Sequence, residues 1–185
     1  MISPPNYSPD DEIAIFRRKW DILRITLETT VYSSPTSPDY GNNYPAALRA
    51  NQLLSPPSLV TALYERSLQL FTPSSPPQKP LSIFLPHQVL TTLILSSIKL
   101  ECYDVGRGII EDWLARRTQD YSKDGSSGYS KVIELYCLNI LPKLEEWEYA
   151  QDFLAYEREL KKSAREVRHY FFYPIRLNLI SPTAL

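Results

Sequence analysis

The sequence is poor in glycine, cysteine and histidine, and these shortages exclude several kinds of site. Its 185 residues include five glycines, two cysteines and two histidines. With so few glycines, a glycine-rich phosphate-binding loop is not expected. A metal site needs several ligands at close spacing, and the His and Cys residues are widely separated along the chain. We therefore predict no metal and no cofactor, and we expect both cysteines to be reduced and buried. They are Cys102 and Cys137.

The sequence also lacks an excess of either charge and lacks a long apolar run. Twenty Lys and Arg residues against 21 Asp and Glu residues give a formal net charge of −1. A general nucleic-acid binder needs a basic excess to release counterions from phosphates. A membrane-spanning helix needs about 18 or more consecutive apolar residues, and residues 170–180, the densest apolar stretch near the end, are too short. We predict no nucleic-acid partner and no membrane span within these 185 residues.

Proline is abundant but unevenly placed. Thirteen of the 16 prolines lie at or before Pro86, and only Pro142 lies between Gln88 and Tyr173. Because proline interrupts helices and central strands, we expect short elements in the first half and nearly continuous helix in the second. The predicted divisions are a disordered lead at 1–9, N-terminal helices at 10–71, a Pro-rich linker or strap at 72–84, a helical-hairpin core at 85–169 and a C-terminal extension at 170–185.

Apolar residues recur at spacings of three and four, which predicts helices. The first helix follows Ser8 as N-cap and Pro9, and it carries one stripe of Ile13, Phe16, Trp20, Leu23 and Leu27. Later helices are expected at 46–54, 56–71, 87–101, 105–119, 129–141 and 144–169. The residues expected to point inward are Leu59, Leu63 and Leu70 in the helix at 56–71, and Val132, Ile133, Tyr136, Cys137, Ile140 and Leu141 in the helix at 129–141. The helix at 87–101 is apolar on all sides, so we expect it to be buried between others.

Two tryptophans, Trp113 and Trp147, are 34 residues apart. This is the period of a tetratricopeptide hairpin, and no segment shows sustained strand-like alternation. The predicted fold is therefore all-α: an array of antiparallel helical hairpins, degenerate and tetratricopeptide-like, closed by the N-terminal helix.

The sequence offers no convincing catalytic constellation. Gly106-Arg107-Gly108 matches half of a dinucleotide fingerprint, but no strand precedes it and the third glycine is missing. We expect these glycines to allow close helix packing or a sharp turn. The adjacent acidic residues at 10–12 and at 145–146 could be mistaken for catalytic carboxylates. We expect them in the first turn of a helix, where acids are favoured by the positive end of the helix dipole. We predict that the protein is not an enzyme.

Basic residues on two predicted helices are the candidate partner-binding residues. Arginine side chains on a rigid helix suit recognition of carboxylates. The alternative is a solvated face, partly paired with Glu157, Glu159 and Glu166 at helical spacing. The candidates are Arg107, Arg116, Arg117, Arg158, Lys161, Lys162 and Arg165.

The region from residue 85 onward resembles the cytosolic domain of the peroxin-26 family and its peroxin-15 relatives. The resemblance covers about 70 residues and depends on the order and spacing of the whole set. The matching positions are Leu85-Pro86, Ser97-Ile98-Lys99, Trp113-Leu114, Tyr129, Leu141-Pro142 and Ala150.

This resemblance implies an α-helical cytosolic domain on a C-terminal anchor in the peroxisomal membrane. It implies an adaptor that recruits the AAA-type ATPase pair for receptor recycling, through the N-terminal region of one ATPase. The sequence ends at Leu185 without an anchor, so we expect a soluble fragment of a longer tail-anchored protein. The alternative is another helical scaffold in protein targeting or complex assembly.

Overall fold

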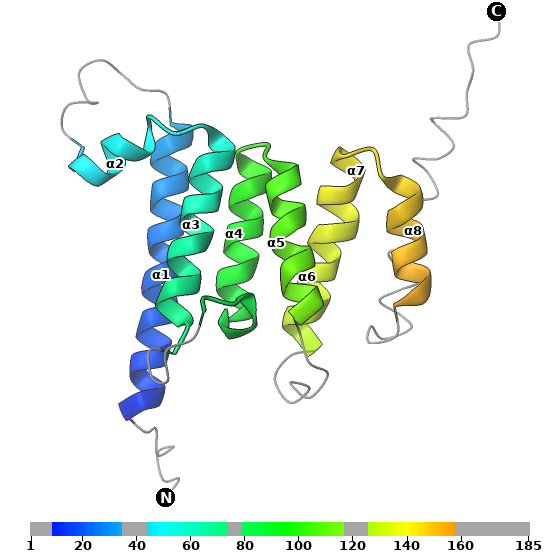
Figure 1. The fold of residues 1–185 in the computed structure, drawn as a ribbon, viewed down its shortest axis with the longest axis horizontal. Coiled ribbons are helices and arrows are strands. Elements are labelled where there is room, and N and C mark those ends of the chain that lie inside the picture. The colour runs from blue at the N-terminus through cyan, green and yellow to red at the C-terminus, as the bar shows by residue number, and fades with distance from the viewer. Residues whose placement is uncertain (1–8, 35–43, 74–78, 117–125, 158–185) are drawn as a thin grey trace, which may run out of the picture.

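The structure is a computed structural model that describes residues 9–34, 44–73, 79–116 and 126–157 (Figure 1). Within these ranges all regular structure is helical and no strand occurs. The predicted all-α class is confirmed. Consecutive long helices run in opposite directions along the chain, with their axes roughly aligned (Figure 1). Their bounds are α1 Pro9–Ser33, α2 Ala46–Asn51, α3 Pro56–Phe71, α4 His87–Lys99, α5 Tyr103–Arg116, α6 Ser126–Leu135, α7 Leu141–Lys143 and α8 Trp147–Tyr156.

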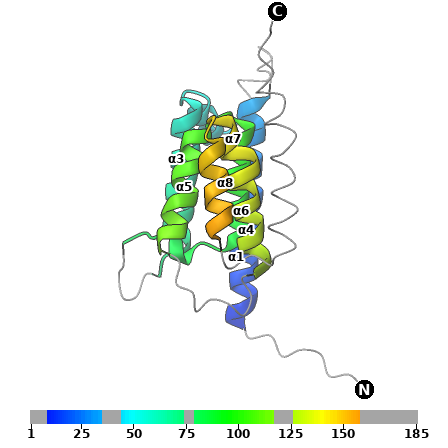
Figure 2. The ribbon, with the colours of Figure 1, turned by 90° about the vertical axis from the view of Figure 1, so that its right-hand side faces the viewer.

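The helices form two layers (Figure 2). One layer holds α1, α4 and α6, with α4 in contact with both of the others. The other layer holds α3 and α5, and α4 and α5 also pack across the layers. A short 3-10 turn, Ser82–Phe84, precedes α4 and contacts α3 and α5. Helix α4 is therefore surrounded, as its all-round apolar pattern predicts.

Two neighbouring groups of buried side chains make up the core. One joins α1, α3 and α4 around Ile25, Leu63 and Leu93. The larger one joins α3 to α8 and includes Trp113 and Tyr136. The inward positions expected for residues 129–141 are all buried, namely Val132, Ile133, Tyr136, Cys137, Ile140 and Leu141. Two expected inward residues are instead exposed at the surface, Leu70 and Leu95.

The helix that begins at Ser126 continues past Pro142. A π-helical turn, Tyr136–Ile140, links α6 to α7, and the helix ends at Lys143. Proline has no N–H, and its ring crowds the carbonyl four residues earlier. A wider π turn directly before Pro142 gives that ring room. The proline therefore lies one residue before the end of the helix.

Two interhelical turns share one geometry and one sequence pattern. Glu101 and Glu145 both adopt a left-handed backbone, with φ of 57° and 62°. The amide after each glutamate donates to a carbonyl five residues back, Cys102 to Ser97 and Glu146 to Leu141, which closes a Schellman cap. The segments around them are K-L-E-C-Y-D-V-G at 99–106 and K-L-E-E-W-E-Y-A at 143–150. The repeat that the structure shows has a spacing of 44 residues.

The 34-residue spacing of the tryptophans does not mark equivalent positions. Trp113 lies near the C-terminal end of α5, whereas Trp147 is the first residue of α8. The structural equivalent of Trp147 is Tyr103, the first residue of α5 and 44 residues earlier. The tryptophan spacing therefore does not support a tetratricopeptide period.

Gly106 lies where α5 crosses α4 closely. A Cβ atom built on it would lie 2.3 Å from Ser97 Oγ and 2.9 Å from Ile140 Cδ1. Gly108, two residues on, has open space around its Cβ position. The expectation of close packing at this motif is confirmed for Gly106 alone. Ala150 occupies the equivalent place in α8 and is fully buried.

We expect Gly106→Ala to destabilise the protein by about 1 kcal/mol, because overpacking outweighs the gain in helix propensity. Gly108→Ala is the matched control, with the same gain and no clash, and we expect it to stabilise by about 0.5–1 kcal/mol. Urea denaturation measures both changes. Ser97→Ala, combined with Gly106→Ala, removes the closest clashing atom and is expected to recover part of the loss. Equal effects of the two glycine substitutions would contradict the close approach.

Candidate functional site

Arg107 lies at the centre of an ion-pair network between α5 and the start of α8. Its Nε donates to Glu111 Oε1 at 2.7 Å, and its Nη1 donates to Glu146 Oε1 at 2.5 Å. The Tyr136 hydroxyl donates to the same Glu111 oxygen at 2.7 Å. The guanidinium carbon also lies 5.8 Å from the ring centroid of Tyr149. This arginine therefore holds helices together as well as reaching the surface.

Arg116 occupies a smaller network at the other end of α5. Its Nε donates to Asp112 Oδ1 at 2.7 Å, and the Tyr64 hydroxyl of α3 donates to Asp112 Oδ2 at 2.9 Å. The Arg116 side chain is 47% exposed, so it remains accessible to a partner. Of the predicted basic residues, Arg107 and Arg116 lie 9 positions apart on one helix and belong to separate networks.

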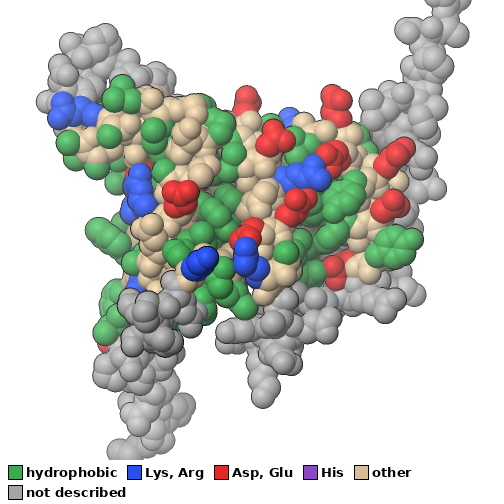
Figure 3. Space-filling model, viewed as in Figure 1, with side chains coloured by type: hydrophobic (Ala, Val, Ile, Leu, Met, Phe, Trp, Pro, Cys, Tyr) green, Lys and Arg blue, Asp and Glu red, His purple; other side chains and the backbone are tan. Residues whose placement is uncertain are grey.

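The other basic candidates lie outside the described residues, and their predicted role stays a prediction. They are Arg117, Arg158, Lys161, Lys162 and Arg165. Among the described residues, three acids are exposed at or near α8, namely Glu145, Glu148 and Asp152. Figure 3 shows acidic side chains grouped over this half of the visible face.

Hydrogen bonding lowers the pKa of Glu111 and of Asp112. Burial raises both pKa values, but it is outweighed by the donors Arg107 and Tyr136 at Glu111 and by Arg116 and Tyr64 at Asp112. Burial also raises the pKa of the Tyr136 hydroxyl, with a further rise from its bond to Glu111. Tyr136 therefore stays protonated at neutral pH and acts as a hydrogen-bond donor.

A carboxyl group whose pKa is lowered by folding stabilises the protein above its ordinary pKa. The ordinary values are 4.5 for Glu111 and 3.8 for Asp112. We expect these contributions to be complete above those values and to be lost as the pH falls through the lower folded-state values. In urea denaturation, the stability difference between wild type and Glu111→Gln should shrink as the pH falls from neutral to below 4.5. A difference that stays constant over this range would contradict the assignment.

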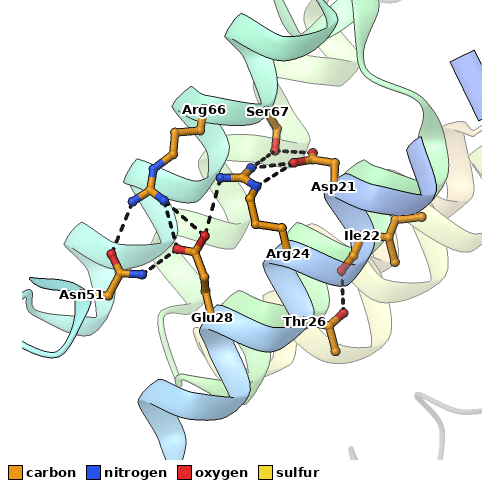
Figure 4. A network of polar contacts seen from close by, with 8 residues as sticks. All are labelled: Asp21, Ile22, Arg24, Thr26, Glu28, Asn51, Arg66 and Ser67. Atoms are coloured by element: carbon orange, nitrogen blue, oxygen red, sulfur yellow. Dashed lines mark hydrogen bonds and ion pairs between the residues drawn. The ribbon is translucent and has the colours of Figure 1, made fainter. Parts of the chain in front are cut away.

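A second polar network attaches α1 to α2 and α3 (Figure 4). Asp21 is fully buried. It accepts from Arg24 Nη2 at 2.6 Å and from the Ser67 hydroxyl at 2.7 Å. Glu28 lies seven residues, or about two helical turns, after Asp21. It accepts from Asn51 Nδ2 at 2.5 Å and from Arg66 Nη1 at 3.0 Å.

Sequence reasoning missed this network. The only signal was the seven-residue spacing of Asp21 and Glu28, which places both carboxylates on one face of α1. That face also carries Ile25, which is fully buried. The face of α1 that packs against the rest of the molecule is therefore largely polar.

The apolar stripe of α1 faces solvent. Its five members are exposed: Ile13 by 55%, Phe16 by 67%, Trp20 by 69%, Leu23 by 57% and Leu27 by 51%. Four of them line a surface hollow together with Arg17 and Lys19. An amphipathic helix of a globular domain ordinarily buries such a stripe. Its exposure identifies the strongest interaction surface on the described part of the molecule.

Cys102 and Cys137 are buried and form no disulfide, as expected, and burial raises the pKa of the Cys102 thiol. Among the described residues, His, Cys, Asp and Glu side chains form no group of three or more suited to a metal ion. None of the described helices has the length and apolar character required to cross a bilayer.

We compared the chain with family models, curated proteins and solved structures, and none of them matched.

Proposed function

We propose that the protein is a non-enzymatic adaptor that recruits an AAA-type ATPase complex to the cytosolic face of the peroxisomal membrane. In this role it serves receptor recycling during matrix protein import, and a C-terminal anchor beyond these residues holds it on the membrane. The ATPase binds through its N-terminal region. The proposal follows from the resemblance of residues 85 onward to the peroxin-26 and peroxin-15 proteins.

One observation supports the resemblance as a likeness of fold. Five of the positions that carry it are packing positions, since Leu85, Trp113, Tyr129, Leu141 and Ala150 are all buried, whereas Lys99 is exposed. Four of these five belong to the larger core group. A shared order of core residues is what two chains of one fold retain when their surfaces differ.

The adaptor role also suits a degenerate, tetratricopeptide-like array of antiparallel hairpins. Such arrays stack similar units and present extended surfaces to other proteins. The repeated turns at Glu101 and Glu145 provide two similar units. The same observation favours the second candidate function, a helical scaffold for targeting or complex assembly outside the peroxisome.

The test is capture of the purified N-terminal region of a peroxisomal AAA-type ATPase by the purified chain. We expect saturable binding. Charge reversal of Arg116 and Arg117 together, or of Lys161 and Arg165 together, is expected to weaken it while circular dichroism stays unchanged. Lys131→Glu on α6 is the matched control, because Lys131 is also an exposed base, 49% accessible at its side chain.

Failure of the wild-type chain to bind the ATPase would overturn the peroxisomal assignment and leave the scaffold function. Binding at wild-type affinity by both double variants would show that the basic residues are not the docking site.

A further inference from the structure

The exposed stripe of α1 has the spacing of a coiled-coil seam. Its members follow one another at intervals of three, four, three and four residues, which are the a and d positions of a heptad. A seam of this kind is narrower than the apolar face by which a helix packs on a globular core. The five residues, Ile13, Phe16, Trp20, Leu23 and Leu27, extend over about 21 Å of helix at 1.5 Å per residue.

The polar network fixes the direction in which this seam points. At 100° per residue, buried Ile25 lies about 140° around the helix from Trp20. Turning the seam inward would withdraw Asp21 and Glu28 from their donors on α2 and α3 (Figure 4). Removing one side of a buried ion pair is strongly unfavourable. The seam is therefore held outward by the fold itself.

Among the described helices, none packs against α1 along the seam, which lies at one edge of its layer. Helix α1 contacts α4 on one side, and Thr29 and Thr30 bond to Ser96 and Lys99 of α4. Figure 1 shows α1 at the edge of the array, and Figure 3 shows hydrophobic side chains projecting there. A stacked array normally ends in a polar surface, so an apolar edge indicates a position for one more helix.

Charged residues beside the seam determine which helix fits. In a coiled coil, the e and g positions flank the seam and select the partner by charge. In α1 these positions hold Arg17 and Lys19, one on each side of Trp20, and both line the surface hollow there. Arg24 follows at the next e position, already bonded to Asp21. Two acids flank the N-terminal end of the seam, Asp10 at an e position and Glu12 at a g position.

We infer that α1 binds one amphipathic helix of a partner protein, with apolar residues at its own a and d positions and carboxylates beside them. The partner's apolar side chains pack between Phe16, Trp20 and Leu23. Its carboxylates lie against Arg17 and Lys19. This surface is separate from the basic residues considered above, and the inference does not depend on the ATPase being the partner.

A second copy of the chain fits this seam poorly. In a parallel pair, where g and e' positions meet, Lys19 of one copy would face Arg24 of the other while Glu12 would face Arg17, so the flanking charges would give no net attraction. Trp20, at a central a position, would also meet itself in the parallel pair. An antiparallel pair, in which a positions pack against d', would set Arg17 against Arg24 in one register near Trp20 and Lys19 against its counterpart in the other. A membrane surface suits a helix with a wider apolar face than an a/d seam provides.

The test uses two synthetic four-heptad peptides with leucine at a and d. One has glutamate at every e and g position, and the other has lysine there. Binding is measured by the fluorescence of Trp20, taken as the difference between wild type and Trp20→Phe. At low ionic strength we expect the acidic peptide to shift this emission to the blue and to bind about tenfold more tightly than the basic one, because it gains two ion pairs and avoids two repulsions.

Two variants make the test specific. Phe16→Ser with Leu23→Ser is expected to abolish binding without changing the circular dichroism spectrum, because both side chains are exposed. Arg17→Glu with Lys19→Glu is expected to reverse the preference to the basic peptide. Leu53→Ser and Leu95→Ser are matched controls, because these exposed leucines lie outside the seam, and both should bind as wild type does.

Four results would each overturn the inference. They are no binding of either peptide, equal binding of both, a Trp20 shift obtained only with vesicles of equimolar phosphatidylserine and phosphatidylcholine, and concentration-dependent self-association in sedimentation that buries Trp20 without peptide. Loss of ATPase capture with retained peptide binding would count against the proposed function alone.

Discussion

Trp113→Ala is expected to lower the free energy of unfolding by about 3–5 kcal/mol, the usual cost of removing a large aromatic side chain from a core. Trp113 is 8% exposed and belongs to the core group that joins α3 to α8. Its ring centroid lies 6.3 Å from that of Tyr129, so the cavity would open between α5 and α6. Urea denaturation followed by far-ultraviolet circular dichroism measures the loss.

Trp147→Ala provides the comparison. Trp147 is only partly buried and packs against the edge of the same core group as the first residue of α8. We expect a smaller loss than at Trp113, because less apolar surface leaves water there on folding. A loss at Trp147 as large as at Trp113 would show that the two rings are equally enclosed and would contradict the structure.

Arg24→Met is expected to destabilise the protein by about 3 kcal/mol, because it leaves the fully buried Asp21 carboxylate without its cationic partner. Asp21 would retain only the Ser67 hydroxyl. The cost arises from the stranded charge more than from the lost bond. Arg17→Met, an exposed arginine of the same helix, is the control and should change stability little.

A double-mutant cycle separates the stranded charge from the lost packing. Asp21→Leu with Arg24→Met replaces both members of the pair by apolar side chains. We expect the double variant to be more stable than Arg24→Met alone, with a coupling energy on the order of 1–3 kcal/mol for groups in direct contact. Additive effects of the two substitutions would show that the interaction between Asp21 and Arg24 contributes nothing to the free energy of unfolding.

The sequence predicted the buried faces well wherever apolar residues alone fill them. Residues 129–141 are an example, since their stripe is both the most apolar face of the helix and the buried one. Helix α1 shows why this reasoning has a limit. Periodicity identifies an apolar face but does not identify what covers it. The face that packs on α3 and α4 is held by Asp21, Glu28 and Thr29, whose partners lie 46, 38 and 67 residues away.

The partner surfaces were harder to predict than the core. Charge and side-chain type marked Arg107 and Arg116 as candidate partner-binding residues, which stays a prediction. Their ion pairs depend on acids brought close by folding, such as Glu146, 39 residues from Arg107. The 44-residue repeat was also missed. Tryptophan drew attention to a 34-residue spacing, whereas the informative residues were Glu101 and Glu145, which occupy backbone positions that glycine ordinarily takes.

These two turns also make the hairpin a portable unit for protein engineering. Each turn is closed by backbone hydrogen bonds within its own few residues, so its shape does not depend on distant parts of the chain. Quasi-linear arrays grow by adding units that contact only their neighbours. Grafting a further hairpin after α8 through another K-L-E-x-aromatic junction would lengthen the array by one unit. The size of such a fold is then set by the number of units, because a stacked array does not have to close on itself as a barrel does.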